Sequence, residues 1–532
     1  MDADKGACLM KQRPAWLPWP LGGRGQLLPL ATVGLAAAAI AARLVVGPNL
    51  IDDAYITFRY AKNLAAGIGL VFNPGERIMG SSSPLYAALL GVFGRMGVEI
   101  PAAAYVLGIC AAAITVILIL RLGEALNARA AGILAAVALA LAPKAVLPSV
   151  SGMETAVFTL WVCGAFYCAV TDKHLAAAAL AGAATVTRPE GILVVIALLC
   201  AMALDRRRPQ AAELVLMVLP ICLWILFATA YFGTPLPHSV TAKWTLYPRY
   251  ADPFYDAKHV FRYLTEPFTW IATGSEILPA HLFFGTAITL GAILVSRRKA
   301  AASALWLWCL MMAGGFAIGN RYIFPWYLAP MVPIFLLLAA IGILTPLLGL
   351  LRGRRFGRSY SRWLAFVCLL LAAVLIMGLG AELMLTARGS SLDIASRENE
   401  YASAATWIQR TLGSEQAIAA VEIGALGFTY PGPIIDLSGL VTPWALAYYT
   451  EEPYVFRFPH DIPPRLIEEK LPSVLVVFDG FLESARGSGI LSSEYCQAYT
   501  SPLTHHAFGT LVVLIRPLAF PSSAPLCSDA SG

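Results

Sequence analysis

Long apolar runs recur through the first 384 residues of the chain and constrain its fold more than any other feature. A helix needs about 20 mostly apolar residues to cross a bilayer, and several of these runs are somewhat shorter. Hydrophobic residues make up 58% of the chain and charged residues 13%, whereas a soluble domain carries about 25% charged residues. The sequence therefore predicts a polytopic α-helical membrane protein with about eleven transmembrane helices, near 28–46, 101–120, 131–147, 154–170, 174–187, 191–204, 211–231, 281–295, 302–319, 328–350 and 363–384.

Short basic clusters between these runs indicate their orientation. Cytoplasmic loops are enriched in Lys and Arg, so we place all the clusters in the cytoplasm. The N-terminus is then cytoplasmic, everything after about residue 385 is extracytoplasmic, and segment 84–96 is a juxtamembrane or re-entrant helix. The small net charge of +6 lies in these clusters and gives no support to nucleic-acid binding. The clusters are Arg121 with Arg129, Lys173, Arg206–Arg208, Arg297–Lys299 and Arg352–Arg362.

The composition divides the chain into three parts. Residues 1–27 form a cytoplasmic N-terminal segment before an uncleaved signal anchor, residues 28–384 form the transmembrane domain, and residues 385–532 form an extracytoplasmic domain. In the last part an amphipathic helix is expected at 398–412, a helical stretch near 464–470, and strands in the short apolar runs 417–423, 433–437, 473–478 and 510–515. This pattern is typical of a small α/β domain.

Two cysteines, Cys496 and Cys527, fall in the C-terminal domain. Outside the cytoplasm they can form a disulfide, although free thiols are equally consistent with the sequence. Most other cysteines lie in apolar runs, where a small buried side chain explains them.

The first predicted extracytoplasmic loop, 47–83, opens with two adjacent carboxylates, Asp52 and Asp53. One acidic residue would suffice to cap the helix expected at 53–66, and ionisable groups beside a membrane span are candidates for function. Tyr55 and Arg59 follow with helical spacing, and Glu76 lies in a turn-rich segment. Each also has a structural interpretation as part of a solvated helix face.

The other predicted extracytoplasmic loops add carboxylates, cations and aromatic side chains. Each is weak alone, because an anchoring arginine or a structural histidine is common. Their shared location on one predicted face favours a single site. These candidate substrate-binding residues are Glu154, Arg188, His238, Lys243, Arg321, Trp326 and Tyr327.

The strings DDAYITFRYAKNL, GLVFNPGE and SSSPL, together with SGMET, TRPEG and RYIFPWYLAP, resemble the GT-C superfamily of membrane glycosyltransferases. They are most similar to the bacterial set that includes the terminal arabinofuranosyltransferases of mycobacterial cell-wall synthesis. The resemblance continues into the C-terminal domain through IGALGF and IIDLSGL.

This resemblance implies a polyprenyl-phosphate sugar as donor, an extracytoplasmic glycan as acceptor, and an active site in a bacterial inner membrane. Asp52 would be the general base and Asp53 its partner, unless the two carboxylates hold a divalent metal; no other cofactor is expected. Cations such as Arg59, Lys243 or Arg321 would contact the leaving phosphate. The sugar would be arabinofuranose or another pentose, and the oligomeric state is left open.

Three alternatives stay open at this point. A lipid-linked sugar transporter would carry charged residues at mid-span and two matching halves, which the sequence lacks. A non-catalytic scaffold could retain the same fold, since fold does not prove function. An enzyme of the same class could instead move a hexose to protein.

Overall fold

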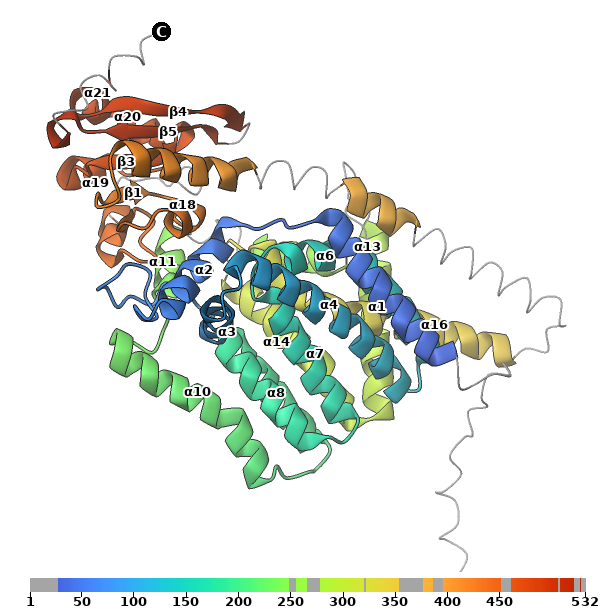
Figure 1. Ribbon diagram of the computed structural model, residues 1–532. Coiled ribbons are helices and arrows are strands. Elements are labelled where there is room, and N and C mark those ends of the chain that lie inside the picture. Colours follow the sequence, from blue (N-terminus) through green and yellow to red (C-terminus); the bar gives the residue numbers. More distant parts are fainter. Residues whose placement is uncertain are drawn as a thin grey trace, which may run out of the picture.

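The computed structural model describes residues 27–247, 255–265, 278–319, 322–353, 377–385, 396–450, 461–505, 508–520 and 527. Figure 1 shows a bundle of long helices with a small sheet domain attached at one end. Arg321, the segment 1–26 and most of the run predicted at 363–384 lie outside the described residues.

Within the described residues, the predicted apolar runs form helices. Among the described residues, five are long and apolar enough to cross a membrane, or six if one bent pair is a single span. Three shorter apolar helices accompany them, so the expected count of about eleven is not confirmed. The bundle helices are α1 (Leu27–Val46), α4 (Ile100–Ala125), α5 (Arg129–Leu141), α6 (Pro143–Val150), α7 (Thr155–Val170), α8 (His174–Thr187), α9 (Ile192–Leu204), α10 (Ala211–Phe232), α13 (Leu278–Arg298), α14 (Ser303–Gly319) and α16 (Val332–Gly353).

The bent pair, α5 and α6, is broken at Pro143, where the chain turns by 52°. The residue before a proline is pushed away from helical geometry, and Ala142 is indeed extended. A broken helix leaves carbonyl groups without their usual partners, which is costly in a membrane.

Arg43 of α1 supplies donors at this break. Its side chain is 1% exposed. Its Nη1 donates to the carbonyl oxygen of Ala140 at 3.1 Å and to that of Ala39 at 2.9 Å, and its Nε donates to Ser149 Oγ at 2.9 Å. The arginine therefore joins α1 to both halves of the broken helix.

Two basic side chains lie together at one end of the bundle. Arg298 donates to the carbonyl oxygen of Leu126 at 2.8 Å, and Lys299 donates to that of Val170 at 2.6 Å. These carbonyls end α4 and α7, so the basic side chains lie where two helix C-termini meet. The cavity described below lies at the opposite end of α7, where the N-cap residue Glu154 lines it.

The first loop folds into α2 (Asp52–Ala65) and α3 (Pro84–Arg95). Twelve residues of helix extend only about 18 Å, which is too short to cross the hydrocarbon core. Helix α3 packs against α2 instead, with Gly91 close to Leu64. This agrees with a juxtamembrane interpretation of segment 84–96.

The C-terminal part is a small α/β domain, as predicted. Its sheet has the order β2-β1-β3-β5-β4, in which β1 pairs in parallel with β2 and β3, and β5 is antiparallel to β3 and β4. A helix at 396–411 matches the expected amphipathic helix. The strands are β1 (Ile418–Ala420), β2 (Ile434–Asp436), β3 (Val474–Phe478), β4 (Cys496–His505) and β5 (Gly509–Ile515).

A disulfide joins Cys496 to Cys527 and ties β4 to the end of the domain.

Short helices complete the fold. The remaining helices are α11 (His238–Leu246), α12 (Tyr255–Thr265), α15 (Pro325–Leu328), α18 (Gly424–Thr429), α19 (Pro464–Lys470), α20 (Glu483–Gly487) and α21 (Ile490–Glu494), with 3-10 turns η1 (Pro189–Gly191) and η5 (Pro443–Tyr449) among them.

The Arg43 contacts predict a stability effect. Replacing Arg43 with Met leaves the Ala140 carbonyl and the Ser149 hydroxyl without their donor, which should lower the free energy of unfolding by about 1–3 kcal/mol. Thermal unfolding of the detergent-purified protein measures this. Arg95→Met is the control, because Arg95 is exposed and its loss should change little. Equal stability of Arg43→Met and the wild type would contradict the role given to Arg43.

Candidate active site

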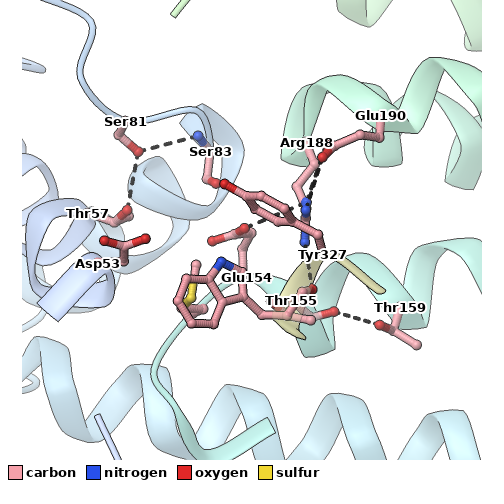
Figure 2. Close-up of polar contacts among 12 residues, drawn as sticks. Asp53, Thr57, Ser81, Ser83, Glu154, Thr155, Thr159, Arg188, Glu190 and Tyr327 are labelled. Carbon is pink, nitrogen blue, oxygen red and sulfur yellow. Dashed lines mark hydrogen bonds and ion pairs between the residues drawn. The ribbon is translucent and has the colours of Figure 1, made fainter. Parts of the chain in front are cut away.

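A cavity of about 280 Å³ lies where α2, the loop before α3 and the ends of several bundle helices meet. Figure 2 shows its polar side chains, with Asp53, Thr57 and Ser81 on one side and Arg188, Glu190 and Tyr327 on the other. It is lined by Asp53, Ile56, Thr57, Gly80–Ser83, Met153, Glu154, Arg188–Glu190, Ser239, Val240, Lys243, Trp326, Tyr327 and Leu440.

Helix α2 presents different residues on two of its faces. Asp53, Ile56 and Thr57, spaced three and four residues apart, face the cavity. Asp52 and Arg59, about two turns apart, face α18 of the C-terminal domain instead. The two adjacent aspartates therefore point to different neighbours.

The carboxylate of Asp52 is hydrogen-bonded to the C-terminal domain. It accepts hydrogen bonds from the backbone N–H groups of Gly424 at 3.0 Å and Ala425 at 2.8 Å, and the residue is 8% exposed. A Cβ at Gly424 would collide with the backbone oxygen of Asp52. Burial and the Glu422 carboxyl raise the pKa of Asp52 to about 7, although the two N–H groups favour its ionised form. Asp52 does not line the cavity.

Arg59 makes further hydrogen bonds in the same contact between α2 and the C-terminal domain. Its guanidinium donates to the carbonyl oxygens of Gly427 at 2.5 Å, Tyr430 at 3.2 Å and Gly432 at 2.8 Å, and to that of Phe72 at 2.7 Å. Its donors are thus directed at backbone carbonyls, away from the cavity, and a direct contact with a donor phosphate is not supported.

Lys243 of α11 is the cation nearest to Asp53. Its Nζ lies 3.8 Å from Asp53 Oδ2 and donates to the Tyr327 hydroxyl at 2.6 Å. Burial alone would lower the pKa of Lys243, but Tyr327 and Asp53 outweigh it, so the pKa is raised and the ammonium stays charged. The two side chains remain 29% and 34% exposed to the cavity. This is a carboxylate and a cation that a substrate can reach.

Arg188 joins two further carboxylates on the opposite wall. It pairs with Glu190 at 3.1 Å and with Glu154 at 3.8 Å, and it is 3% exposed. Burial lowers the pKa of Arg188, but Glu190 and Glu154 more than compensate and raise it. Burial raises the pKa of Glu154, despite the nearby Arg188. Arg188 is therefore already neutralised and can orient carboxylate oxygens toward the cavity.

The structure brings together half of the candidates from sequence. Of these, Asp53, Glu154, Arg188, Lys243, Trp326 and Tyr327 line the cavity. Five others do not line it, namely Asp52, Tyr55, Arg59, Glu76 and His238, and Arg321 lies outside the described residues.

Three of the excluded residues have structural contacts instead. Tyr55 packs its ring against Phe428, 5.7 Å between centroids. Glu76 accepts a hydrogen bond from Asn73 in an exposed turn. The backbone N–H of His238 donates to Met79, and burial lowers the pKa of its ring. None of the three forms part of the cavity wall.

Sequence reasoning did not select the hydroxyl groups of the cavity. Thr57 Oγ1 lies 3.2 Å from Ser81 Oγ, and Ser83 hydrogen-bonds the Glu154 carboxyl. Glu190, one of the outer-loop carboxylates in the TRPEG string, also lines the cavity. The SSSPL run was the available signal, yet serines are too common in loops to be distinguished without the fold.

A shared metal site on the aspartate pair does not fit these residues. Both oxygens of Asp52 accept backbone N–H groups, and only Asp53 faces the cavity. Across the described part of the chain, no group of three or more His, Cys, Asp and Glu side chains is placed to hold a metal ion.

Comparison with known proteins shows which fold the chain has. A family model described as a domain of unknown function, DUF8728, matches residues 392–514. No curated protein matches the chain. Among solved structures, AglB from Archaeoglobus fulgidus, in complex with an inhibitory peptide and a dolichol-phosphate, is 13% identical with a TM-score of 0.57, over 92% of this chain and 74% of that one.

A second similar structure is ArnT from Cupriavidus metallidurans bound to undecaprenyl phosphate, 15% identical with a TM-score of 0.52, over 92% of this chain and 98% of that one. AftD from Mycobacteria is 16% identical with a TM-score of 0.44, over 91% and 41%, which is too distant to support an argument. The chain thus has the fold of the GT-C glycosyltransferases, as its motifs predicted.

The raised pKa of Asp52 predicts how stability changes with pH. The pKa is raised from the ordinary 3.8 to about 7 in the folded protein. A raised pKa contributes stability at low pH that is lost as pH rises through the folded value. The melting temperature should therefore fall between about pH 4 and pH 7.

A variant at the neighbouring residue tests this cause. Glu422→Gln removes the carboxyl that helps to raise the pKa of Asp52, so the fall should become shallower. Glu494→Gln is the control, because Glu494 pairs with Arg516 away from the interface. A melting temperature that rises with pH, or an unchanged slope in Glu422→Gln, would refute this explanation.

Proposed function

We propose that the protein is a membrane glycosyltransferase that moves a sugar from a polyprenyl-phosphate donor to an acceptor hydroxyl, with Asp53 as the general base. The observation that carries the proposal is the pair formed by Asp53 and Lys243, which face one cavity 3.8 Å apart. A displacement from a phosphate needs these two groups: a base for the nucleophile and a cation for the leaving group.

The fold supports a lipid-phosphate donor. The similar ArnT structure is bound to undecaprenyl phosphate, and the similar AglB structure is in complex with a dolichol-phosphate. A helical bundle also offers an apolar environment for a prenyl tail, while the polar cavity at its end receives the phosphate and the sugar.

The reaction we propose is a direct displacement. The acceptor hydroxyl oxygen attacks the anomeric carbon while its proton passes to the Asp53 carboxylate. The bond from the anomeric carbon to the phosphate oxygen breaks, and its electron pair leaves with the prenyl phosphate. Lys243, held by the Tyr327 hydroxyl at 2.6 Å, stabilises the charge that grows on that phosphate. A phosphate leaves readily, so little acid assistance is required.

The opposite wall fits a sugar. Glu154 and Glu190, fixed by Arg188, accept hydrogen bonds from sugar hydroxyls, and the side chains of Ser81–Ser83 add donors and acceptors. Trp326 and Tyr327 offer aromatic faces. The cavity of about 280 Å³ accommodates one monosaccharide. We propose arabinofuranose or another pentose as the sugar, from the motif resemblance.

The proposed location is a bacterial inner membrane, with the cavity and the C-terminal domain on the extracytoplasmic side. The basic side chains at the other end of the bundle, Arg298 and Lys299, support this orientation. A disulfide between Cys496 and Cys527 is also in keeping with an oxidising compartment.

The base assignment is tested by comparing two asparagine variants. Asp53→Asn keeps the shape of the side chain but cannot take the proton, so transfer should fall by about 10²–10⁴ while the protein still binds the donor. Asp52→Asn should reduce transfer less, because Asp52 does not line the cavity and acts only indirectly, through its contact with α18. Transfer is measured with a radiolabelled polyprenyl-phosphate pentose.

The opposite order would contradict the assignment. A severe loss in Asp52→Asn with near-normal transfer by Asp53→Asn would return the role of base to Asp52. Near-normal transfer by both variants would remove the enzymatic interpretation of this cavity and favour a non-catalytic scaffold.

A further inference from the structure

The C-terminal domain reaches the cavity through one loop. This roof loop, residues 436–442, follows β2. Among the described residues, Leu440 is the one side chain of the C-terminal domain that lines the cavity. The other lining residues come from α2, the bundle helices and their connecting loops.

A buried aspartate determines the shape of the roof loop. The Asp436 carboxylate accepts hydrogen bonds from the backbone N–H groups of Ser438 at 2.8 Å and Val441 at 2.9 Å. The Asp436 N–H donates to Thr442 Oγ1 at 2.9 Å, which closes the loop at its other end. Gly439 takes a φ of +74°, which a glycine adopts without strain. Leu440 is therefore presented from a fixed backbone.

The roof loop is packed against two walls of the cavity. Gly80 of the serine-rich segment lies so close to Val441 that a Cβ there would overlap its side chain. Just after the loop, Leu446 of η5 packs with Ala242 and Leu246 of α11. Leu440 is thus fixed relative to both Ser81–Ser83 and Lys243.

We propose that the domain of unknown function forms a fixed roof over the cavity and that Leu440 is a specificity-determining residue, setting the size of acceptor that reaches Asp53. This inference rests on the proposed function. The donor carries a prenyl tail that must stay among the spanning helices, so it approaches from the bundle. The C-terminal domain lies beside α2 and α11 at one end of the bundle (Figure 1), and a polar glycan acceptor would arrive from that side.

The chemistry of the residue suits this role. Leucine makes no hydrogen bond, so it neither holds nor orients a particular hydroxyl group. It limits the space above the reacting atoms and can pack against the C–H groups of a sugar ring. Its size should therefore control how bulky an acceptor can be, while the polar groups below control the sugar that is moved.

Acceptor-size selectivity tests this inference. The probes are a radiolabelled polyprenyl-phosphate pentose as donor and a series of octyl glycosides as acceptors, from a monosaccharide to a branched oligosaccharide. Leu440→Trp should lower kcat/KM for the largest acceptor about tenfold more than for the smallest, the scale of a small misfit in a binding pocket. Leu440→Ala should shift the ratio in the opposite direction.

The ratio of kcat/KM between the largest and the smallest acceptor separates this role from a structural one, because a change in folding or in donor binding would alter both values equally. Leu503→Trp is the control, since Leu503 is exposed on β4 of the same domain, and it should leave the acceptor ratio as in the wild type.

The inference is overturned by an equal loss for all acceptors, which would show that Leu440 is only structural, or by an unchanged acceptor ratio in both variants. Failure of the proposed function looks different. In that case the wild type itself would not transfer sugar to any acceptor.

Discussion

The position of α2 depends on one contact, between its charged face and the ends of α18. Asp52 accepts the N–H groups that begin α18, and Arg59 donates to carbonyls at and beyond its other end. These groups have no partners within the short helix, so an acid at one end and a base at the other satisfy them. Removing one partner of such a buried hydrogen bond commonly costs about 1–3 kcal/mol, because the other group is left unsatisfied. The membrane bundle and the C-terminal domain therefore share one buried polar interface.

This interface explains why two adjacent aspartates begin α2. Successive residues of a helix point about 100° apart, so the two carboxylates cannot serve the same neighbour. Asp52 is used to hold the C-terminal domain, and that contact directs Asp53 toward Lys243. The same domain then closes the cavity through Leu440. Positioning of the carboxylate and shaping of the cavity thus depend on the same domain.

Much of the fold could be predicted because hydrophobic patterning is local. This patterning predicted the apolar runs, the helix at Pro464–Lys470 and four of the five strands. Strand β4, Cys496–His505, was not predicted, because it is a largely exposed edge strand and lacks an apolar run. The bend at Pro143 was also missed, because the run from 131 to 147 reads as one continuous apolar segment.

The site could be predicted only in part. The sequence places Asp52 and Asp53 side by side, but which one faces a cavity depends on what packs against α2. Arg59 illustrates the same limit, since its acceptor on Gly427 lies 368 positions away. In the sequence, a cation beside a carboxylate pair indicates a phosphate-binding site. In the folded chain, the Arg59 guanidinium instead donates hydrogen bonds to backbone carbonyl oxygens. Lys243 and Tyr327 were found because each lies in a loop rich in aromatic residues.

The central claim is that the cavity between Asp53 and Lys243 receives the donor phosphate. The most direct measurement is a cryo-EM structure of the purified full chain with added polyprenyl phosphate. We predict density for the phosphate within hydrogen-bonding distance of Lys243 Nζ, with the prenyl chain running along the bundle helices. A lipid phosphate bound elsewhere, with the cavity beside Asp53 left without it, would contradict the account.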